Sequence, residues 1–306
     1  MLELGSMTLH FYGVAVALAA ALSVLCLKNH TRGTRVDAVT LALFVLPCAF
    51  ALARLMYCVV RCEVVFLEMG PLFALETWNG GFMLWGALAG GMLGAALYAR
   101  SARVPCAQVL DALACPAMLM IALCRAAEVF VMDEGRGAYL DEGFFCRFPF
   151  AVCNEYGEWQ LAVFVWEAAA ALVIFFLARL RREREAGDRV SFALMLYAAC
   201  QVIFESLRMD STPRFGFVRV SQVLAAVVLL LCVLWRSRHG GVKRMTGSAA
   251  LVLAMAGIAG GLEWVIDKTP VPLPVCYAVM ALAMGVCVAA GLRGAKRIDG
   301  NVQGTC

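Results

Sequence analysis

The chain has 306 residues, of which 63% are hydrophobic and 16% charged, and its mean hydropathy is +0.82. Soluble proteins average about 45–50% apolar and about 25% charged residues, so too few polar groups remain here to cover a water-facing surface. The same composition excludes disordered, collagen-like and coiled-coil proteins. It predicts a multi-span membrane protein.

Nine apolar runs follow one another along the chain, at about 9–27, 38–60, 82–99, 106–132, 160–178, 190–207, 219–235, 247–265 and 273–292. Most are close to the roughly 20 residues that a membrane helix needs, whereas barrel strands would alternate and be about half as long. We therefore predict an all-α polytopic membrane helix bundle with about nine transmembrane helices. The first nine residues contain Glu3 and no Lys or Arg, unlike a secretory signal, so we expect the first span to be retained.

Basic residues follow every second run, which sets the orientation because cytoplasmic loops are enriched in Lys and Arg. The opposite loops are acidic, so we expect the N-terminus outside and the C-terminus in the cytoplasm. The net charge of +4 then reflects topology and anionic lipid, and we expect no nucleic-acid partner. Seventeen of the 26 basic residues lie on the predicted inner side: Lys28, Arg32, Arg35, Arg100, Arg103, Arg179, Arg181, Arg182, Arg184, Arg189, Arg236, Arg238, Lys243, Arg244, Arg293, Lys296 and Arg297.

The basic segment 236–244 is the predicted boundary between two parts of the chain. Residues 1–240 would form a seven-helix membrane domain, and residues 241–306 an additional two-helix hairpin with a basic cytoplasmic tail. Glu263 and Asp267 lie near the outer connection of the last two runs, where we expect a solvated turn.

Most of the 14 cysteines lie in apolar runs, where Cys is a small apolar residue. Cys146 and Cys153 instead fall in the long outer loop, and the sequence leaves open whether they form a disulfide. Without a CxxC motif or a His pair, we expect no metal site and no cofactor.

Ionisable residues inside membrane spans are candidate functional residues, because each costs about 2.5–3.5 kcal/mol at a helix centre on insertion scales. In the predicted orientation all but Asp111 lie in the outer half of the bilayer. The alternative is that these charges pair only to hold helices together. The set is Arg54, Asp111, Arg125, Glu128, Glu167, Glu205 and Arg208.

Residue spacing groups some of these charges. Arg125 and Glu128 are three residues apart and share a helix face. One polar stripe on the sixth span must line a cavity or meet polar partners on other helices, and it consists of Tyr197, Gln201, Glu205 and Arg208.

The third span is rich in glycine. Gly80 and Gly81 at its start would let the backbone approach a ligand closely. Its small residues predict a tight helix–helix contact, and they are Gly86, Gly90, Gly91 and Gly94.

Several short motifs follow one another along residues 8–235. They are His10-Phe-Tyr-Gly13, Ala53-Arg54-Leu55-Met56-Tyr57, Trp78-Asn79-Gly80-Gly81, Arg125, Trp166-Glu167, the stripe from Tyr197 to Arg208, and Ser221-Gln222. In order and spacing they resemble the prolipoprotein diacylglyceryl transferase family. The resemblance implies a transferase that moves a diacylglyceryl group from phosphatidylglycerol to the cysteine thiol of a lipobox-bearing prolipoprotein.

Three positions depart from the family pattern. Trp85 stands where the family has a His, Glu128 where it has an Asn, and Gln201 where it has an Arg. The departures keep open a non-catalytic relative that binds phospholipid or lipoprotein precursors. A transporter fits less well, because the charges lie off-centre in the bilayer.

The implied reaction needs a base for the thiol and cations for the departing phosphate. We expect Glu128, Glu167 or Glu205 to accept the proton. The expected phospholipid ligands are Arg125, Arg54, Arg208, Tyr197, Gln222, Gly80 and Gly81.

Overall fold

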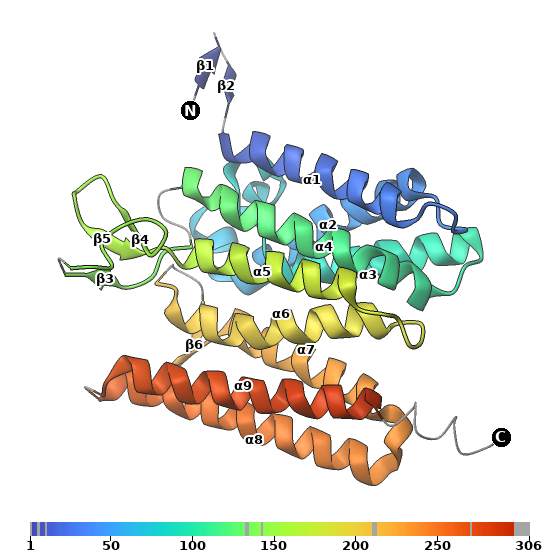
Figure 1. Cartoon of the computed structure of the whole chain (residues 1–306). Helices are drawn as coiled ribbons and strands as arrows, with labels where there is room; N and C mark the ends of the chain where they lie inside the picture. Colours follow the sequence, from blue (N-terminus) through green and yellow to red (C-terminus); the bar gives the residue numbers. More distant parts are fainter. Residues whose placement is uncertain are drawn as a thin grey trace.

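The computed structural model describes residues 2–4, 7–9, 11–131, 135–141, 143–209, 213–269 and 271–296, so His10 lies outside the described residues. Within these ranges nine long helices run side by side in one bundle (Figure 1). They are α1 (Phe11–His30), α2 (Ala38–Val60), α3 (Leu84–Ala102), α4 (Cys106–Ala127), α5 (Val163–Leu180), α6 (Asp188–Leu207), α7 (Val220–Ser237), α8 (Gly241–Lys268) and α9 (Leu273–Lys296). The predicted all-α membrane bundle is confirmed.

The remaining elements are short. β1 (Leu2–Leu4) pairs with β2 (Met7–Leu9), and β6 (Arg214–Phe215) with β7 (Val218–Arg219). Between α4 and α5, strands β3 (Tyr139–Leu140), β4 (Ala151–Cys153) and β5 (Trp159–Leu161) form an antiparallel sheet in the order β3-β5-β4. Single helical turns η1 (Glu63–Glu68), η2 (Pro71–Leu75) and η3 (Thr77–Asn79) join α2 to α3, η4 (Glu128–Phe130) follows α4, and η5 (Arg238–Gly240) joins α7 to α8.

Seven described stretches are long and apolar enough to cross a membrane. One of them, Val220–Lys268, contains both α7 and α8. α3 is not among the seven, because four glycines and Arg100 lower its hydropathy. The helices therefore agree with the predicted runs, while the number of spans and their orientation stay predictions.

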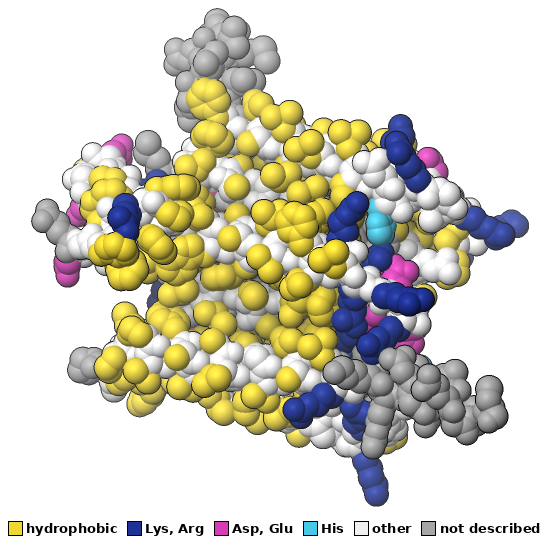
Figure 2. Space-filling view, in the orientation of Figure 1, with side chains coloured by type: hydrophobic (Ala, Val, Ile, Leu, Met, Phe, Trp, Pro, Cys, Tyr) yellow, Lys and Arg dark blue, Asp and Glu magenta, His cyan; other side chains and the backbone are white. Residues whose placement is uncertain are grey.

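The two ends of the bundle differ in charge (Figure 2). A broad apolar surface covers the helices, and Lys and Arg side chains gather at one end, here called the basic end. The β3–β5 sheet lies at the opposite end, here called the sheet end (Figure 1).

Glycines bring α3 against α2 as predicted. A Cβ atom at Gly86 or Gly90 would overlap the α2 backbone, and one at Gly94 would lie 2.6 Å from the carbonyl oxygen of Phe44. Gly91 lies at the edge of this contact, since its Cβ would lie 3.9 Å from Val45 Cγ1 of α2, an ordinary contact. Packing in lipid depends on such close approach, because apolar side chains gain little by leaving lipid for protein.

The hairpin of α8 and α9 packs on α6 and α7 in a shared apolar core. Val252 and Ala259 of α8 and Met280 and Cys287 of α9 are buried there. Gly291 of α9 lies against Met195 of α6, where a Cβ would overlap the sulfur. The hairpin is thus integrated into the bundle through side chains along most of its length.

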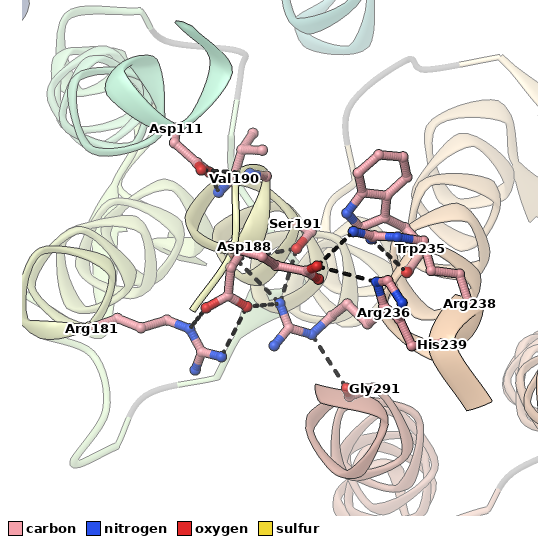
Figure 3. A network of polar contacts seen from close by, with 12 residues as sticks. Asp111, Arg181, Asp188, Val190, Ser191, Trp235, Arg236, Arg238, His239 and Gly291 are labelled. Atoms are coloured by element: carbon pink, nitrogen blue, oxygen red, sulfur yellow. Dashed lines mark hydrogen bonds and ion pairs between the residues drawn. The ribbon is translucent and has the colours of Figure 1, made fainter. Parts of the chain in front are cut away.

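A buried polar network holds four helices together at the basic end (Figure 3). Asp188 accepts hydrogen bonds from Arg181 at 3.0 and 3.1 Å and forms an ion pair with Arg236 at 2.9 Å. Arg236 also donates to the Ser191 hydroxyl at 2.9 Å and to the carbonyl oxygen of Gly291 at 3.2 Å. These contacts join the end of α5 to α6, α7 and α9.

Asp111 has a structural role at the same end (Figure 3). Its carboxylate accepts the backbone N–H groups of Gly187 at 2.6 Å and Val190 at 2.9 Å. These donors at the start of α6 have no partner within the helix, so Asp111 caps it from α4.

The two loop cysteines are free thiols in the structure. Cys146 donates its S–H to the carbonyl oxygen of Asp141 at 3.0 Å, and Cys153 is exposed on β4. The disulfide left open by the sequence is not formed.

Gly90→Ala should destabilise the protein by about 1–3 kcal/mol, because the added methyl group forces α3 away from the α2 backbone. Gly91→Ala, one residue away, should keep or slightly raise stability, since Ala favours helix over Gly. Thermal unfolding in detergent measures both. Equal midpoints for the two variants would contradict the tight α2–α3 contact.

Candidate functional site

Four charged side chains form a closed ring near the sheet end. Arg125 of α4 pairs with Glu128 at the start of η4, and its Nε lies 2.7 Å from Glu167 Oε2 of α5. Arg208, which directly follows α6, completes the ring with Nη2 at 2.9 Å from Glu128 Oε2 and Nη1 at 3.4 Å from Glu167 Oε1. Each arginine contacts both carboxylates, so the ring alternates in charge and is neutral.

The ring is enclosed by protein. The side chain of Glu167 is fully buried, and Arg125, the least buried member, is 12% exposed. Ions in an apolar interior are stable only when their partners are present, because neither water nor lipid solvates them. The structure thus brings together four of the six charges predicted to lie at one depth.

Gly135 holds the chain after η4 against the ring. Its φ of +73° suits glycine, and a Cβ there would overlap Glu128 Oε2 and lie 2.7 Å from Phe164 Cβ. The carbonyl oxygen of Gly135 accepts the backbone N–H of Phe164 at 2.8 Å. Sequence reasoning missed this residue, although the Gly135-Arg136-Gly137 sequence shortly after a long apolar run was the available signal.

The polar stripe of α6 turns inward as predicted. Tyr197 is 1% exposed, and its phenol group lies within reach of the charges of Arg125, Glu167 and Arg208. One turn further along α6, Gln201 Nε2 donates to Glu205 Oε1 at 3.2 Å, and both residues are buried. The stripe thus extends the ring into a larger polar interior.

Trp85 is placed for packing. It is buried in the apolar core that α6, α7 and the hairpin share, and its ring centroid lies 6.4 Å from that of Tyr197. An indole has only an N–H donor and accepts no proton at neutral pH. Trp85 therefore contributes to packing beside Tyr197 and does not act as a base.

Glu263 is not in a solvated turn, and that prediction is wrong. α8 extends to Lys268, and Glu263 Oε1 accepts a hydrogen bond from Gln222 Nε2 of α7 at 2.8 Å. The turn was predicted because the apolar run ends near residue 265, which says nothing about the direction of a side chain. Asp267, one turn later, is about half exposed and pairs with Lys268 at 3.2 Å.

Arg54 lies apart from the ring and organises the connection between α2 and α3. Its guanidinium group stacks on Phe73, with the guanidinium carbon 4.9 Å from the centroid of the Phe73 aromatic ring. Gly80 and Gly81 contribute carbonyl groups to this connection, and the predicted role of all three in phospholipid binding stays a prediction. The guanidinium donates to the carbonyl oxygens of Phe73, Ala74, Glu76, Gly80 and Gly81.

A cavity of about 330 Å³ opens between η4 and the β3–β5 sheet, beside the ring. Its walls are mainly apolar and include Phe148, Trp159 and Phe164. Arg136 also lines it, with Nη1 3.3 Å from Gln160 Oε1 and a buried Nε that has no hydrogen-bond partner in the described structure. Arg136 lies in an irregular loop, so no periodic pattern in the sequence predicts where its side chain lies.

The described residues contain no group of three or more His, Cys, Asp or Glu side chains arranged to hold a metal ion. The polar side chains described around the ring carry guanidinium, carboxylate, amide and phenol groups.

The fold and the ring define a polytopic membrane protein with a buried polar site near one end of its bundle. A family model described as prolipoprotein diacylglyceryl transferase matches residues 1–236, and the chain belongs to that family. The family resemblance noted in the sequence motifs is confirmed.

Similar proteins named phosphatidylglycerol–prolipoprotein diacylglyceryl transferase span most of the chain. The one from Lactiplantibacillus plantarum is 27% identical over 270 residues, covering 83% of this chain and 95% of that protein. The one from Streptococcus equi subsp. equi is 25% identical over 251 residues, covering 79% and 96%. The one from Listeria welshimeri is 24% identical over 242 residues, covering 76% and 86%.

Glu167→Gln should destabilise the protein by about 3–5 kcal/mol, because two buried guanidinium groups then share the single charge of Glu128. Glu155→Gln, the same change on the exposed turn between β4 and β5, should stay within about 0.5 kcal/mol of the parent. Thermal unfolding compares them. Similar small losses in both variants would show that the ring is not a structural unit.

Proposed function

We propose that this chain transfers the diacylglyceryl group of phosphatidylglycerol to the cysteine thiol of a lipobox-bearing prolipoprotein. The observation that supports this most directly is the neutral ring of two arginines and two carboxylates, buried in a member of the prolipoprotein diacylglyceryl transferase family. It combines groups that bind phosphate with groups that accept a proton.

The transfer exchanges one bond for another. The thiol loses its proton, and the thiolate sulfur attacks the glycerol carbon that carries the phosphate ester. A C–S thioether bond forms, the C–O bond breaks, and glycerol phosphate leaves with the electron pair. The protein must therefore supply a base and stabilise the growing charge on phosphate.

The ring links these two needs. In the resting ring each guanidinium charge is balanced by carboxylates, so the arginines carry no surplus charge for an anion. When Glu128 or Glu167 accepts the thiol proton, that carboxyl becomes neutral and the ring gains one positive charge. We assign phosphate binding to Arg125, the most accessible member, with Arg208 as the second cation.

The supporting roles follow from position. Tyr197 and Gln222 would bind oxygen atoms of the headgroup, and Glu205 with Gln201 would orient the polar stripe. The two expected substrates are a membrane phospholipid and a prolipoprotein. We further propose residues 1–240 as the transferase domain, with its site in the outer half of a bacterial plasma membrane.

Purified protein should convert phosphatidylglycerol and a lipobox peptide into a lipidated peptide, detected by mass spectrometry. Arg125→Ala should lower the rate by at least about a hundredfold, because it removes a donor aimed at developing charge. Arg147→Ala should leave the rate unchanged, since that arginine is exposed on the loop before β4 and stacks on Phe144.

The absence of product from every phospholipid tested would contradict the proposal. Phospholipid binding without turnover would favour a non-catalytic relative, consistent with a ring that is already neutral.

Two native thiols test the orientation. Cys62 follows α2 at the sheet end, Cys106 begins α4 at the basic end, and both are exposed. In variants in which one of these is the only cysteine, an impermeant maleimide added to intact spheroplasts should label Cys62, and Cys106 only after permeabilisation. Mass shift on a gel reads the result, and the opposite pattern would reverse the predicted topology.

A further inference from the structure

We infer that the α8–α9 hairpin completes the headgroup site, with Glu263 as a positioning residue that orients Gln222. The hairpin lies outside residues 1–236, which the family model matches. The inference rests on the proposed function and deepens it, because it names the part of the lipid that Gln222 recognises.

The Gln222 side chain has a fixed orientation. It is 4% exposed, and its Nε2 donates to the backbone carbonyl oxygen of Val202 at 3.0 Å and to Glu263 Oε1 at 2.8 Å. A primary amide has two N–H donors, and both are used here. A carboxylate only accepts hydrogen bonds, so Glu263 distinguishes the nitrogen of the amide from its oxygen.

The oxygen atom of the Gln222 amide can accept a hydrogen bond from a ligand. Gln222 Oε1 is buried and has no hydrogen-bond partner within the described residues. Such a group is costly in an apolar interior unless a donor reaches it. The hydroxyl groups of a glycerol headgroup are donors of this kind, whereas the oxygens of an ionised phosphate accept only. Gln222 therefore suits the glycerol moiety, and the arginines of the ring suit the phosphate.

The start of α7, which carries Gln222, is tied to a residue of the ring. Arg219, three residues before Gln222, donates through Nη2 to the backbone carbonyl oxygen of Arg208, so the start of α7 is tied to a ring residue. At the basic end, Arg236 Nε binds the carbonyl oxygen of Gly291 (Figure 3). With α8 and α9 fixed along their length, Glu263 reaches Gln222 without a mobile loop.

The test compares Glu263→Leu with Glu263→Gln in the full-length chain. Glu263→Leu removes one of the two hydrogen bonds that orient the Gln222 amide, so the KM for phosphatidylglycerol in mixed micelles should rise about tenfold with little change in kcat. Glu263→Gln retains an oxygen that accepts from Gln222 Nε2 and should keep KM within about twofold. Asp267→Leu, one turn further on the same helix but exposed, is the matched control and should behave as the parent.

Soluble inhibitors separate glycerol recognition from phosphate recognition. Glu263→Leu should weaken inhibition by glycerol phosphate about tenfold and leave inhibition by inorganic phosphate unchanged. In a Gln222→Leu background, Glu263→Leu should have no further effect, because the two residues act through one hydrogen bond.

An unchanged KM in Glu263→Leu would overturn the inference. So would a fall in kcat and in thermal midpoint that leaves KM unchanged, because that result describes a residue needed only for folding. If the parent chain forms no lipidated peptide, the proposed function fails instead, so the two failures are distinguishable.

Discussion

The closed ring of Arg125, Glu128, Arg208 and Glu167 is the constraint on which the rest of the structure depends. A buried ion is tolerated only beside its counter-ion, so the elements that carry these four residues cannot move independently. α4, α5 and the end of α6 are fixed relative to one another by charge as well as by packing. The glycine after η4 lies against this fixed group, and the inward stripe of α6 ends in its Arg208.

The ring also separates two uses of arginine in one chain. Arg125 and Arg208 face carboxylates, whose charge a single proton can cancel. Arg54 faces backbone carbonyl groups, which cannot be protonated at any ordinary pH, so its environment is constant. A guanidinium held by carboxylates can respond to chemistry nearby, and one held by carbonyl groups is part of the scaffold.

Much of this was accessible from the sequence, for definite reasons. Unbroken apolar runs of the right length predict helices, and the three-residue spacing of Arg125 and Glu128 predicts a shared face. The contact between Gln222 and Glu263 was not predictable, because it depends on how α7 and α8 are rotated about their axes across 41 residues of sequence. The hydrogen bonds from Arg54 to backbone carbonyl groups were not predictable for a similar reason, since irregular turns have no periodicity that shows where a carbonyl points.

The distribution of the ring over three helices has a consequence for how the chain enters the membrane during synthesis. At the sheet end, α4 and the turn after it carry opposite charges in Arg125 and Glu128, so these two charges balance each other when the segment meets lipid. α5 brings Glu167 alone, and its charge is balanced only by arginines of other segments. The charge of Glu167 is therefore paired with Arg125 only if α5 lies beside α4 when it leaves the insertion machinery. Stable insertion of α5 thus depends on α4.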